Sequence, residues 1–392
     1  MRRLVSVLGM PQHRFASIHV VGTNGKSSVA AATAALLEAH GIGAGAYLSP
    51  HGERWSQRVV IGGEEIRGEA FGSAVERVAA AVAVVNRGLA EDDSVTQFEA
   101  ATTTAFVALA DARVRVGVIE AGLGGRLDAT NVLLSRVTVL TSIGLDHTQW
   151  LGESEIEIAA EKLAVLRDHT LLVAGELDPE VAALAEREAG ARHARMVVAR
   201  DPGRAGEPIA VPYQRRNFAL ALAAASELAG ALDPERVAAV AAGPALPGRM
   251  EVRAGDPPLV LDAAHNPAGA LALAEALEPA LAGRHAVACI AVLADKDAAA
   301  ILAALAPAID TAICTEVPVA RLAGAGRPET RSHAATELAA LARGAGIASV
   351  EAVADPVAAT ERARELARRR RGVMIACGSH YLLGYASEGA RS

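Results

Sequence analysis

The stretch IHVVGTNGKSSVAAATAALLEAHG, residues 18–41, limits most strongly how this chain can fold. Its apolar start, at 17–21, predicts a buried strand, and the alanine- and leucine-rich run at 26–40 predicts a helix. Between them, Gly22 and Gly25 permit backbone angles that other residues avoid, so the loop can turn its amides inward around an anion. A strand, a glycine loop and a helix in this order form one unit of an α/β fold.

This loop resembles a phosphate-binding loop in which one position has changed. Val20 stands where the full pattern has a glycine, five residues before the Gly-Lys pair. Lys26 could reach the outer phosphates of a nucleotide, and Ser27 or Ser28 could offer a hydroxyl to Mg²⁺. The alternative is a tight turn with a capping serine. We interpret the loop as a phosphate-binding site, while kinase, GTPase and ligase activities all remain open. The predicted nucleotide-binding residues are Gly22, Thr23, Asn24, Gly25, Lys26, Ser27 and Ser28.

Strand-like runs alternate with helical patterns along most of the chain, which predicts parallel sheets covered by helices. Further strands are expected at 45–48, 114–122 and 137–143, and further helices at 101–112, 153–166 and 215–232. The segment AAGPALPGRMEV, at 241–252, breaks the alternation with prolines and glycines. We therefore expect two domains, 1–245 and 246–392, of which the second is a smaller open sheet.

Composition excludes several classes of protein. Among 392 residues, 52% are apolar, but no uninterrupted apolar run reaches the ~18–20 residues that a membrane span needs. The start has no signal-peptide pattern, so we expect a cytoplasmic protein. A net charge of −7 argues against nucleic acid as a partner. Cys289, Cys314 and Cys377 are too few and too widely spaced for a disulfide framework or a metal site, which predicts buried free thiols.

Lysine is rare in this chain. Of 38 basic residues, three are lysines: Lys26, Lys162 and Lys296. Arginine supplies positive charge elsewhere, so these lysines are candidates for positions that need a flexible primary amine.

Several longer motifs follow the glycine loop in a fixed order. They are YLSPHGERWSQRV (47–59), TQFEAATTTAF (96–106), IEAGLGGRLDATNV (119–132), TSIGLDHTQWLG (141–152) and AAEKLAV (159–165), then PGRMEV, LDAAHNP, LADKD and CGSHYLLG. With GTNGKSS, they resemble the folylpolyglutamate synthase/dihydrofolate synthase branch of the Mur ligase superfamily. The resemblance implies a P-loop NTPase-like parallel-sheet domain followed by a smaller Rossmann-like α/β domain. It also accounts for Val20, because this family's short loop, G-T-N-G-K, lacks the outermost glycine.

The family joins a carboxylate to the amine of glutamate through an acyl phosphate, and this implies ATP and Mg²⁺ as cofactors, with two ions expected. By resemblance, Ser49, Glu120 and His147 hold the metal. The lysine that matches Lys162 is carbamylated by CO₂ in the family, which arginine could not undergo. The simpler interpretations are a loop cap for Glu120, a loop histidine for His147, and for Lys162 a surface lysine paired with an acid. The catalytic residues that the resemblance implies are Lys26, Glu120, His147 and Lys162.

The resemblance also implies nucleotide contacts from Asn217, Arg249 and Asp262. The alternatives are a helix N-cap for Asp262 and a surface salt bridge for Arg249. His265 and Ser379 are implied to line the glutamate pocket. Lys296 matches the family as well, but the sequence offers no physical account of its role.

The expected substrates are L-glutamate and either dihydropteroate or reduced folates, bound by a monomer. The resemblance implies that Thr96, Leu127, Asp128 and Ala129 contact the pterin-bearing substrate. The chain departs from the family at Gln57, where glutamate is usual, and at Ser27, where glycine is usual. Two alternatives remain open: a Mur-type ligase acting on a cell-wall precursor, and a nucleotide-binding paralogue without ligase activity.

Overall fold

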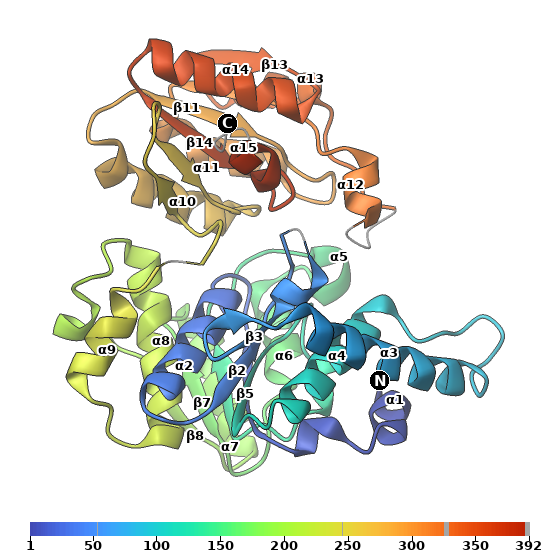
Figure 1. Cartoon of the computed structure of the whole chain (residues 1–392). Coiled ribbons are helices and arrows are strands. Elements are labelled where there is room, and N and C mark those ends of the chain that lie inside the picture. The colour runs from blue at the N-terminus through green and yellow to red at the C-terminus, as the bar shows by residue number, and fades with distance from the viewer. Residues whose placement is uncertain (53, 245, 325–328, 389–392) are drawn as a thin grey trace. The chain divides into compact units, whose positions relative to one another are not determined.

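The computed structural model describes residues 1–52, 54–244, 246–324 and 329–388 (Figure 1). The chain divides into two compact units. The first consists of Met1–Gly144 and Thr148–Gly243, and the second of Leu145–His147 and Pro244–Ser392. The short segment Leu145–His147 therefore packs as part of the second unit, although the residues on both sides of it in the chain belong to the first.

The first unit is built on an eight-stranded sheet with the order β4-β3-β2-β5-β1-β6-β7-β8. Strands β2, β5, β1, β6, β7 and β8 are parallel to one another, whereas β3 and β4 add an antiparallel edge next to β2 that the sequence did not predict. The strands are β1 (Ala16–Val21), β2 (Ala44–Tyr47), β3 (Val59–Ile61), β4 (Glu64–Glu65), β5 (Val116–Glu120), β6 (Val137–Leu140), β7 (Leu171–Ala174) and β8 (Arg195–Val198).

Helices cover both faces of this sheet. Helix α2 packs against α8 and α9, while α3 packs on α4 and α6 on α7. Because crossover connections are right-handed, α2, which leads from β1 back towards β2, lies on the face opposite to α6 and α7. The helices are α1 (Arg2–Val7), α2 (Lys26–Ala39), α3 (Gly68–Asn86), α4 (Gln97–Asp111), α5 (Thr148–Leu151), α6 (Glu155–Leu163), α7 (Pro179–Ala191), α8 (Pro212–Ala229) and α9 (Pro234–Ala241).

The second unit has a six-stranded sheet with the order β13-β12-β11-β14-β10-β9, in which β9 alone is antiparallel to its neighbour. Its strands are β9 (Glu251–Arg253), β10 (Leu259–Leu261), β11 (Ala286–Ile290), β12 (Thr311–Cys314), β13 (Ser349–Ala352) and β14 (Val373–Cys377). Its helices are α10 (Pro267–Leu281), α11 (Ala298–Leu305), α12 (Val319–Gly324), α13 (Ala335–Gly344), α14 (Pro356–Arg369) and α15 (Leu383–Glu388). The two α/β units confirm the predicted fold class.

Small side chains bring α14 close to the second sheet. Ala359, Ala363 and Ala367 recur every fourth residue, which places them on one face of the helix, and all three are completely buried in the core formed with β10, β11 and β14. Alanine lets a helix approach a sheet closely while retaining the best helix propensity. The cysteines Cys289, Cys314 and Cys377 are buried and free, as predicted, and burial raises the pKa of each thiol.

Among the helices in the described parts of the chain, none is both long enough and apolar enough to cross a membrane.

The close packing of Gly372 against the backbone of His285 predicts how a substitution at this glycine changes the stability of the second unit. A Cβ at Gly372 would lie 2.2 Å from the carbonyl oxygen of His285, a backbone atom that cannot move cheaply. We expect Gly372→Ala to lower the free energy of unfolding by about 1–3 kcal/mol, measured by urea denaturation. Gly344→Ala in α13 is the matched control, because no heavy atom lies within 4 Å of its Cβ position. It should be neutral or slightly stabilising; equal losses in both variants would contradict the proposed packing.

Candidate active site

Strand register places four loops of the first unit at one edge of its sheet. Val20 of β1 pairs with Glu120 of β5, and Val21 pairs with Leu140 of β6. Tyr47 at the end of β2 pairs with the residue before Glu120. The loops that follow β1, β2, β5 and β6 therefore start side by side at the carboxyl ends of parallel strands, where α/β proteins bind their ligands.

Both glycines of the first loop are required by their surroundings. Gly22 has a φ of 146°, and a Cβ there would lie 1.9 Å from Thr141 Oγ1. Gly25 has a φ of 84° and caps the N-terminus of α2, and its Cβ would lie 2.4 Å from Asn217 Oδ1. The loop is therefore wedged between the segment after β6 and helix α8, and Asn217 lies directly beside it.

Hydrogen bonds fix the loop to the segment after β6. The Thr23 amide donates to the carbonyl of Ser142 at 2.7 Å, and the Asn24 amide donates to the Ser142 hydroxyl at 3.0 Å. The Thr141 hydroxyl donates to the Asn24 carbonyl at 2.6 Å. The sequence did not identify Thr141 or Ser142 as site residues, although their position directly after a buried strand is a usable signal.

Two lysines converge on one carbonyl group of this loop. Lys26 Nζ donates to the Gly22 carbonyl oxygen at 3.0 Å, and Lys162 Nζ donates to the same oxygen at 3.0 Å. Lys162 is buried on α6, a helix whose N-terminus is closed by a capping box between Ser154 and Glu157. This burial excludes the interpretation of Lys162 as a helix-surface lysine.

A buried carboxylate lies next to the start of α2. Glu120 is 2% exposed, and its Oε2 accepts hydrogen bonds from the Ser27 hydroxyl at 2.8 Å and from the Ser49 amide at 2.8 Å. The Ser27 hydroxyl also lies 3.1 Å from Oε1. Of the two serines that follow Lys26, Ser27 is the one that contacts Glu120. The structure thus brings together Ser27, Ser49 and Glu120, while His147 packs with the second unit.

This oxygen-rich set fits Mg²⁺ better than a transition metal. No group of three or more His, Cys, Asp or Glu side chains suitable for a metal occurs within the described ranges. Glu120 supplies one carboxylate, Ser27 supplies a hydroxyl group in contact with it, and the backbone of Ser49 lies beside it through its amide. Mg²⁺ prefers such hard oxygen ligands and keeps several of its waters, so it needs few protein ligands.

The residues predicted to contact the pterin-bearing substrate lie on two other elements of the first unit. Thr96 is the N-cap of α4: its hydroxyl accepts from the Glu99 amide at 3.1 Å, and its own amide donates to Glu99 at 2.8 Å. Asp128 is the N-cap of a short 3₁₀ helix that begins at Ala129. Leu127, beside it, is 91% exposed, whereas Ala129 is buried.

In the second unit, Lys296 contacts Asp146 and His147 and so holds the segment that carries them. Its ammonium group donates to Asp146 Oδ1 at 2.5 Å and lies 3.1 Å from His147 Nε2. Asn266 donates to the other oxygen of Asp146 at 3.0 Å. Burial favours the neutral form of Asp146, but the charge and hydrogen bond of Lys296, together with the neighbouring His147 and His265, outweigh it and hold the pKa of this carboxyl well below its usual range. Lys296 thereby fixes the segment that carries His147.

Asp262 joins two backbone segments at the end of β10. Its carboxylate accepts from the Met250 amide at 2.7 Å and from the Ala264 amide at 2.8 Å. The N-cap of α10 is Asn266, which excludes the helix-cap interpretation of Asp262. Arg249 directly precedes Met250, so the contact to Asp262 also fixes the backbone next to Arg249.

The two residues predicted for glutamate follow neighbouring strands. His265 comes shortly after β10, and its Nδ1 lies 2.8 Å from the Ala263 carbonyl oxygen. Partial burial and the charges of Lys296 and Arg249 lower the pKa of His265, against the opposing charge of Asp146, so the ring is neutral at neutral pH and Nδ1 carries the proton donated to Ala263. Ser379 follows β14 and is 2% exposed.

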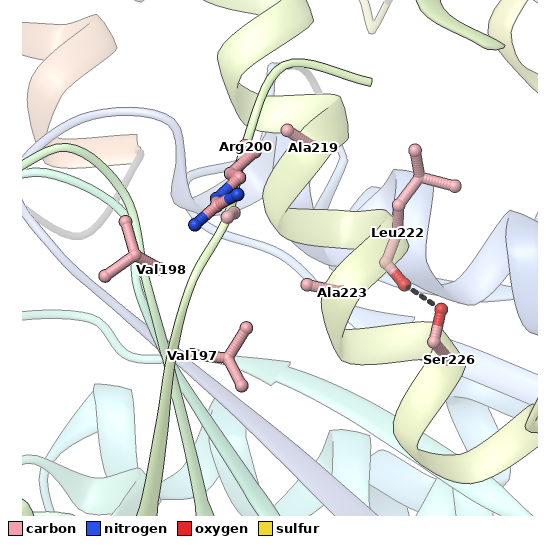
Figure 2. Close-up of a pocket in the computed structure, with 8 residues that line it drawn as sticks. Val197, Val198, Arg200, Ala219, Leu222, Ala223 and Ser226 are labelled. Atoms are coloured by element: carbon pink, nitrogen blue, oxygen red, sulfur yellow. Dashed lines mark hydrogen bonds between the residues drawn. The ribbon is translucent and has the colours of Figure 1, made fainter. Parts of the chain in front are cut away.

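A separate groove in the first unit shares no residue with this site. Figure 2 shows it between β8 and α8. Its lining is mostly aliphatic, and Arg200 supplies a positive charge there. The lining residues are Val197, Val198, Ala199, Arg200, Ala219, Leu222, Ala223 and Ser226. None of them was predicted from the sequence as a site residue.

Comparison with known proteins agrees with this geometry. The dihydrofolate synthase/folylpolyglutamate synthase of Mycobacterium tuberculosis is 36% identical over 352 residues, which cover 80% of this chain and 72% of that protein. The chain belongs to the folylpolyglutamate synthase/dihydrofolate synthase family. The Escherichia coli enzyme of the same name is 30% identical over 383 residues, covering 94% of this chain and 85% of that one. The resemblance identified from the motifs is therefore confirmed.

The second unit and the overall fold are matched as well. Residues 248–380 match the family model described as Mur ligase, glutamate ligase domain. A crystal structure of Mycobacterium tuberculosis folylpolyglutamate synthase complexed with ADP and AMPPCP aligns with a TM-score of 0.90 and 32% identity, covering 100% of this chain and 94% of that one. Mur ligase architecture, as predicted, is therefore the architecture of this folylpolyglutamate synthase/dihydrofolate synthase family member.

The tightly packed glycine loop yields a test of nucleotide binding. Gly25→Ala would place a Cβ at positive φ and within 2.4 Å of Asn217 Oδ1. We expect affinity for Mg²⁺-ADP, measured by calorimetry, to fall by about 30-fold or more, because a left-handed alanine is strained and the loop must shift.

Gly43→Ala is the control, because nothing lies within 4 Å of its Cβ position. It should bind ADP like the unmodified protein. An unchanged affinity in Gly25→Ala would show that the loop does not hold the nucleotide.

Proposed function

We propose that this chain is an ATP-dependent ligase that joins the carboxylate of a pteroate or folate acceptor to the amine of L-glutamate. The acceptor carboxylate attacks the γ-phosphorus of ATP, which gives an acyl phosphate and releases ADP. The glutamate amine then attacks the acyl carbon, and the bond to phosphate breaks, leaving an amide and free phosphate. Dihydrofolate synthase activity, folylpolyglutamate synthase activity, or both would follow from this chemistry.

The observation that carries this proposal is the convergence of Lys26 and Lys162 on the Gly22 carbonyl. Two amines at one point of a glycine loop, beside the buried carboxylate of Glu120, form a site for polyphosphate and its counter-cation. In such a site Lys26, which stays cationic when Lys162 is carbamylated, stabilises the charge that develops on a transferring phosphoryl group. The loop amides and the start of α2 add a positive field at the same place.

The first unit also contains the groups that would hold a metal ion. Ser27, Ser49 and Glu120 of this unit would bind Mg²⁺, and family resemblance adds His147, from the second unit, as a proposed metal ligand. Bound Mg²⁺ supplies charge neutralisation for the attack of one anion on another. We propose that Lys162 is carbamylated: its neutral amine adds to CO₂, forms an N–C bond and loses one proton. The anionic group that results would remove the repulsion between Lys26 and Lys162.

For the second unit we propose nucleotide contacts through Arg249 and Asp262 and glutamate contacts through His265 and Ser379. Support comes from their placement, because Leu261 at the end of β10 pairs with Ala376 of β14. The segments that carry Asp262, His265 and Ser379 therefore begin at adjacent strand ends. The neutral ring of His265 is suited to hydrogen bonding rather than to charge pairing.

We also propose that the protein acts in the cytoplasm as a monomer on small molecules, without nucleic acid. The net charge of −7 supports the last point. Sedimentation velocity measures the oligomeric state directly, and a sedimentation coefficient of a dimer would contradict the proposed monomer.

The ligase reaction predicts a strict requirement for four components. ADP and phosphate should be released when ATP, Mg²⁺, L-glutamate and an acceptor are all present, and removal of Mg²⁺ by EDTA should abolish release. The acceptors to compare are dihydropteroate, tetrahydrofolate and a Mur-type cell-wall precursor, with ADP as the readout. Turnover with the cell-wall precursor alone would favour the Mur-type alternative. No turnover despite tight ADP binding would favour a paralogue without ligase activity.

Carbamylation predicts that Lys162 cannot be replaced by another cation. We expect Lys162→Arg to lower kcat by roughly 100-fold or more, because arginine keeps the charge but cannot react with CO₂. In unmodified protein supplied with ¹³C-bicarbonate, ¹³C NMR should show a carbamate signal that Lys162→Arg lacks. Full activity in Lys162→Arg, or an identical spectrum for both proteins, would overturn the assignment.

A further inference from the structure

A buried histidine in the centre of the first sheet has a contact that the proposed reaction does not use. His19 lies on β1, its side chain is fully buried, and its Nε2 is 2.7 Å from Thr130 Oγ1. Its other ring nitrogen, Nδ1, is buried and has no hydrogen-bond partner among the described residues. Burial, with a smaller contribution from the charge of Arg167, lowers the pKa of His19 to about 3, so the ring is neutral.

Thr130 connects this histidine to Asp128. The Thr130 hydroxyl contacts Asp128 Oδ1, and the Thr130 amide donates to the same oxygen at 2.9 Å. The other oxygen, Oδ2, accepts from the amides of Gly122 at 3.0 Å and Leu123 at 2.9 Å. Each oxygen of Asp128 thus receives two hydrogen bonds, which occupies the roughly four acceptor positions of a carboxylate.

The direction of each hydrogen bond in this chain follows from its chemistry. Three backbone amides donate to Asp128 and favour its ionised form, which opposes the rise in its pKa caused by burial. An ionised carboxylate can only accept, so the Thr130 hydroxyl donates to it and accepts from His19 Nε2–H. The proton of neutral His19 is therefore on Nε2, and the nitrogen without a partner is the deprotonated one. No buried N–H of this ring is left without an acceptor.

The loop that Asp128 organises is glycine-rich and carries exposed apolar side chains. Residues 122–128 include three glycines, so the loop has little side-chain packing of its own to define its shape. Leu127 is 91% exposed and Leu123 is 40% exposed. With its carboxylate already occupied by these hydrogen bonds, Asp128 is placed to shape this loop, on which Leu123 and Leu127 are exposed.

We propose that His19 and Thr130 are positioning residues that set acceptor affinity by fixing Asp128, and through it the loop 122–130, to the central strand of the sheet. Asp128 then contributes to acceptor binding through loop shape and not by bonding the acceptor itself. This inference rests on the proposed ligase function. It places a determinant of acceptor binding inside the sheet, on the same strand that leads into the nucleotide loop.

Thr130 gives the first test, because valine has the same shape without the hydroxyl. We expect Thr130→Val to raise KM for dihydropteroate, or for tetrahydrofolate if that is the acceptor, by about tenfold. KM for ATP should change less than twofold. Thr130→Ser retains the hydroxyl and should restore acceptor KM to within about twofold of the unmodified enzyme. An unchanged acceptor KM in Thr130→Val, or equal rises in both KM values, would overturn the proposal.

His19 gives a second, matched pair of variants. His19→Gln keeps an N–H donor at about the reach of Nε2, whereas His19→Leu fills similar space without one. His19→Leu should reproduce the acceptor KM effect, and His19→Gln should largely avoid it. Calorimetric ADP affinity is the control for damage to β1, since this strand carries the nucleotide loop. Weakened ADP binding in step with the loss of acceptor affinity would assign His19 a structural role and overturn the proposal.

These experiments separate this inference from the function on which it rests. An unmodified protein with no acceptor-dependent ADP release would overturn both. An active unmodified protein whose acceptor KM is insensitive to Thr130→Val would overturn the positioning role alone and leave the ligase function intact.

Discussion

The carbonyl group of Gly22 is the point on which the site in the first unit depends. Two lysines from different helices donate to it, and Gly22 itself adopts a φ of 146° in close contact with Thr141, where no side chain would fit. The parallel register of β1 with β5 then places Glu120 beside the same loop. The Gly22 carbonyl oxygen therefore determines where the amines of Lys26 and Lys162 lie, and strand β5 determines where the carboxylate of Glu120 lies beside them.

Much of the fold follows from the sequence because the parallel strands are continuous apolar runs and their helices have clear ends. Helix α2 begins at Lys26 and β1 ends at Val21, close to the predicted bounds. The antiparallel strands β3 and β4 were not predicted, since three- and two-residue strands are too short to show a periodic pattern. Nor could the sequence indicate that residues 145–147 pack with the second unit, because that depends on long-range contacts to Lys296 and Asn266.

In the candidate site, too, some residues could be identified from the sequence and others could not. Residues in glycine-rich or charged loops after strands, such as Lys26 and Glu120, are visible in the sequence because their type and position agree. His19 and Thr130 are not, since a histidine within a strand and a threonine after Asp128 carry no signal until the fold brings them together. Gln57, which departs from the family, still stabilises its loop, because its side-chain oxygen accepts from the Gly52 and Arg54 amides, as a glutamate would.

The second unit is discontinuous in sequence, and this affects how the protein can be divided. A fragment that starts at Pro244 would include Lys296 and Asn266 but would lack Asp146, the carboxylate that both contact. The buried ammonium group of Lys296 would then lose its nearer counter-charge and keep the more distant Asp295, at 4.0 Å, so a fragment cut at this boundary would be incomplete. A boundary chosen by chain position alone therefore does not isolate this unit, because three residues of it are encoded about a hundred positions earlier.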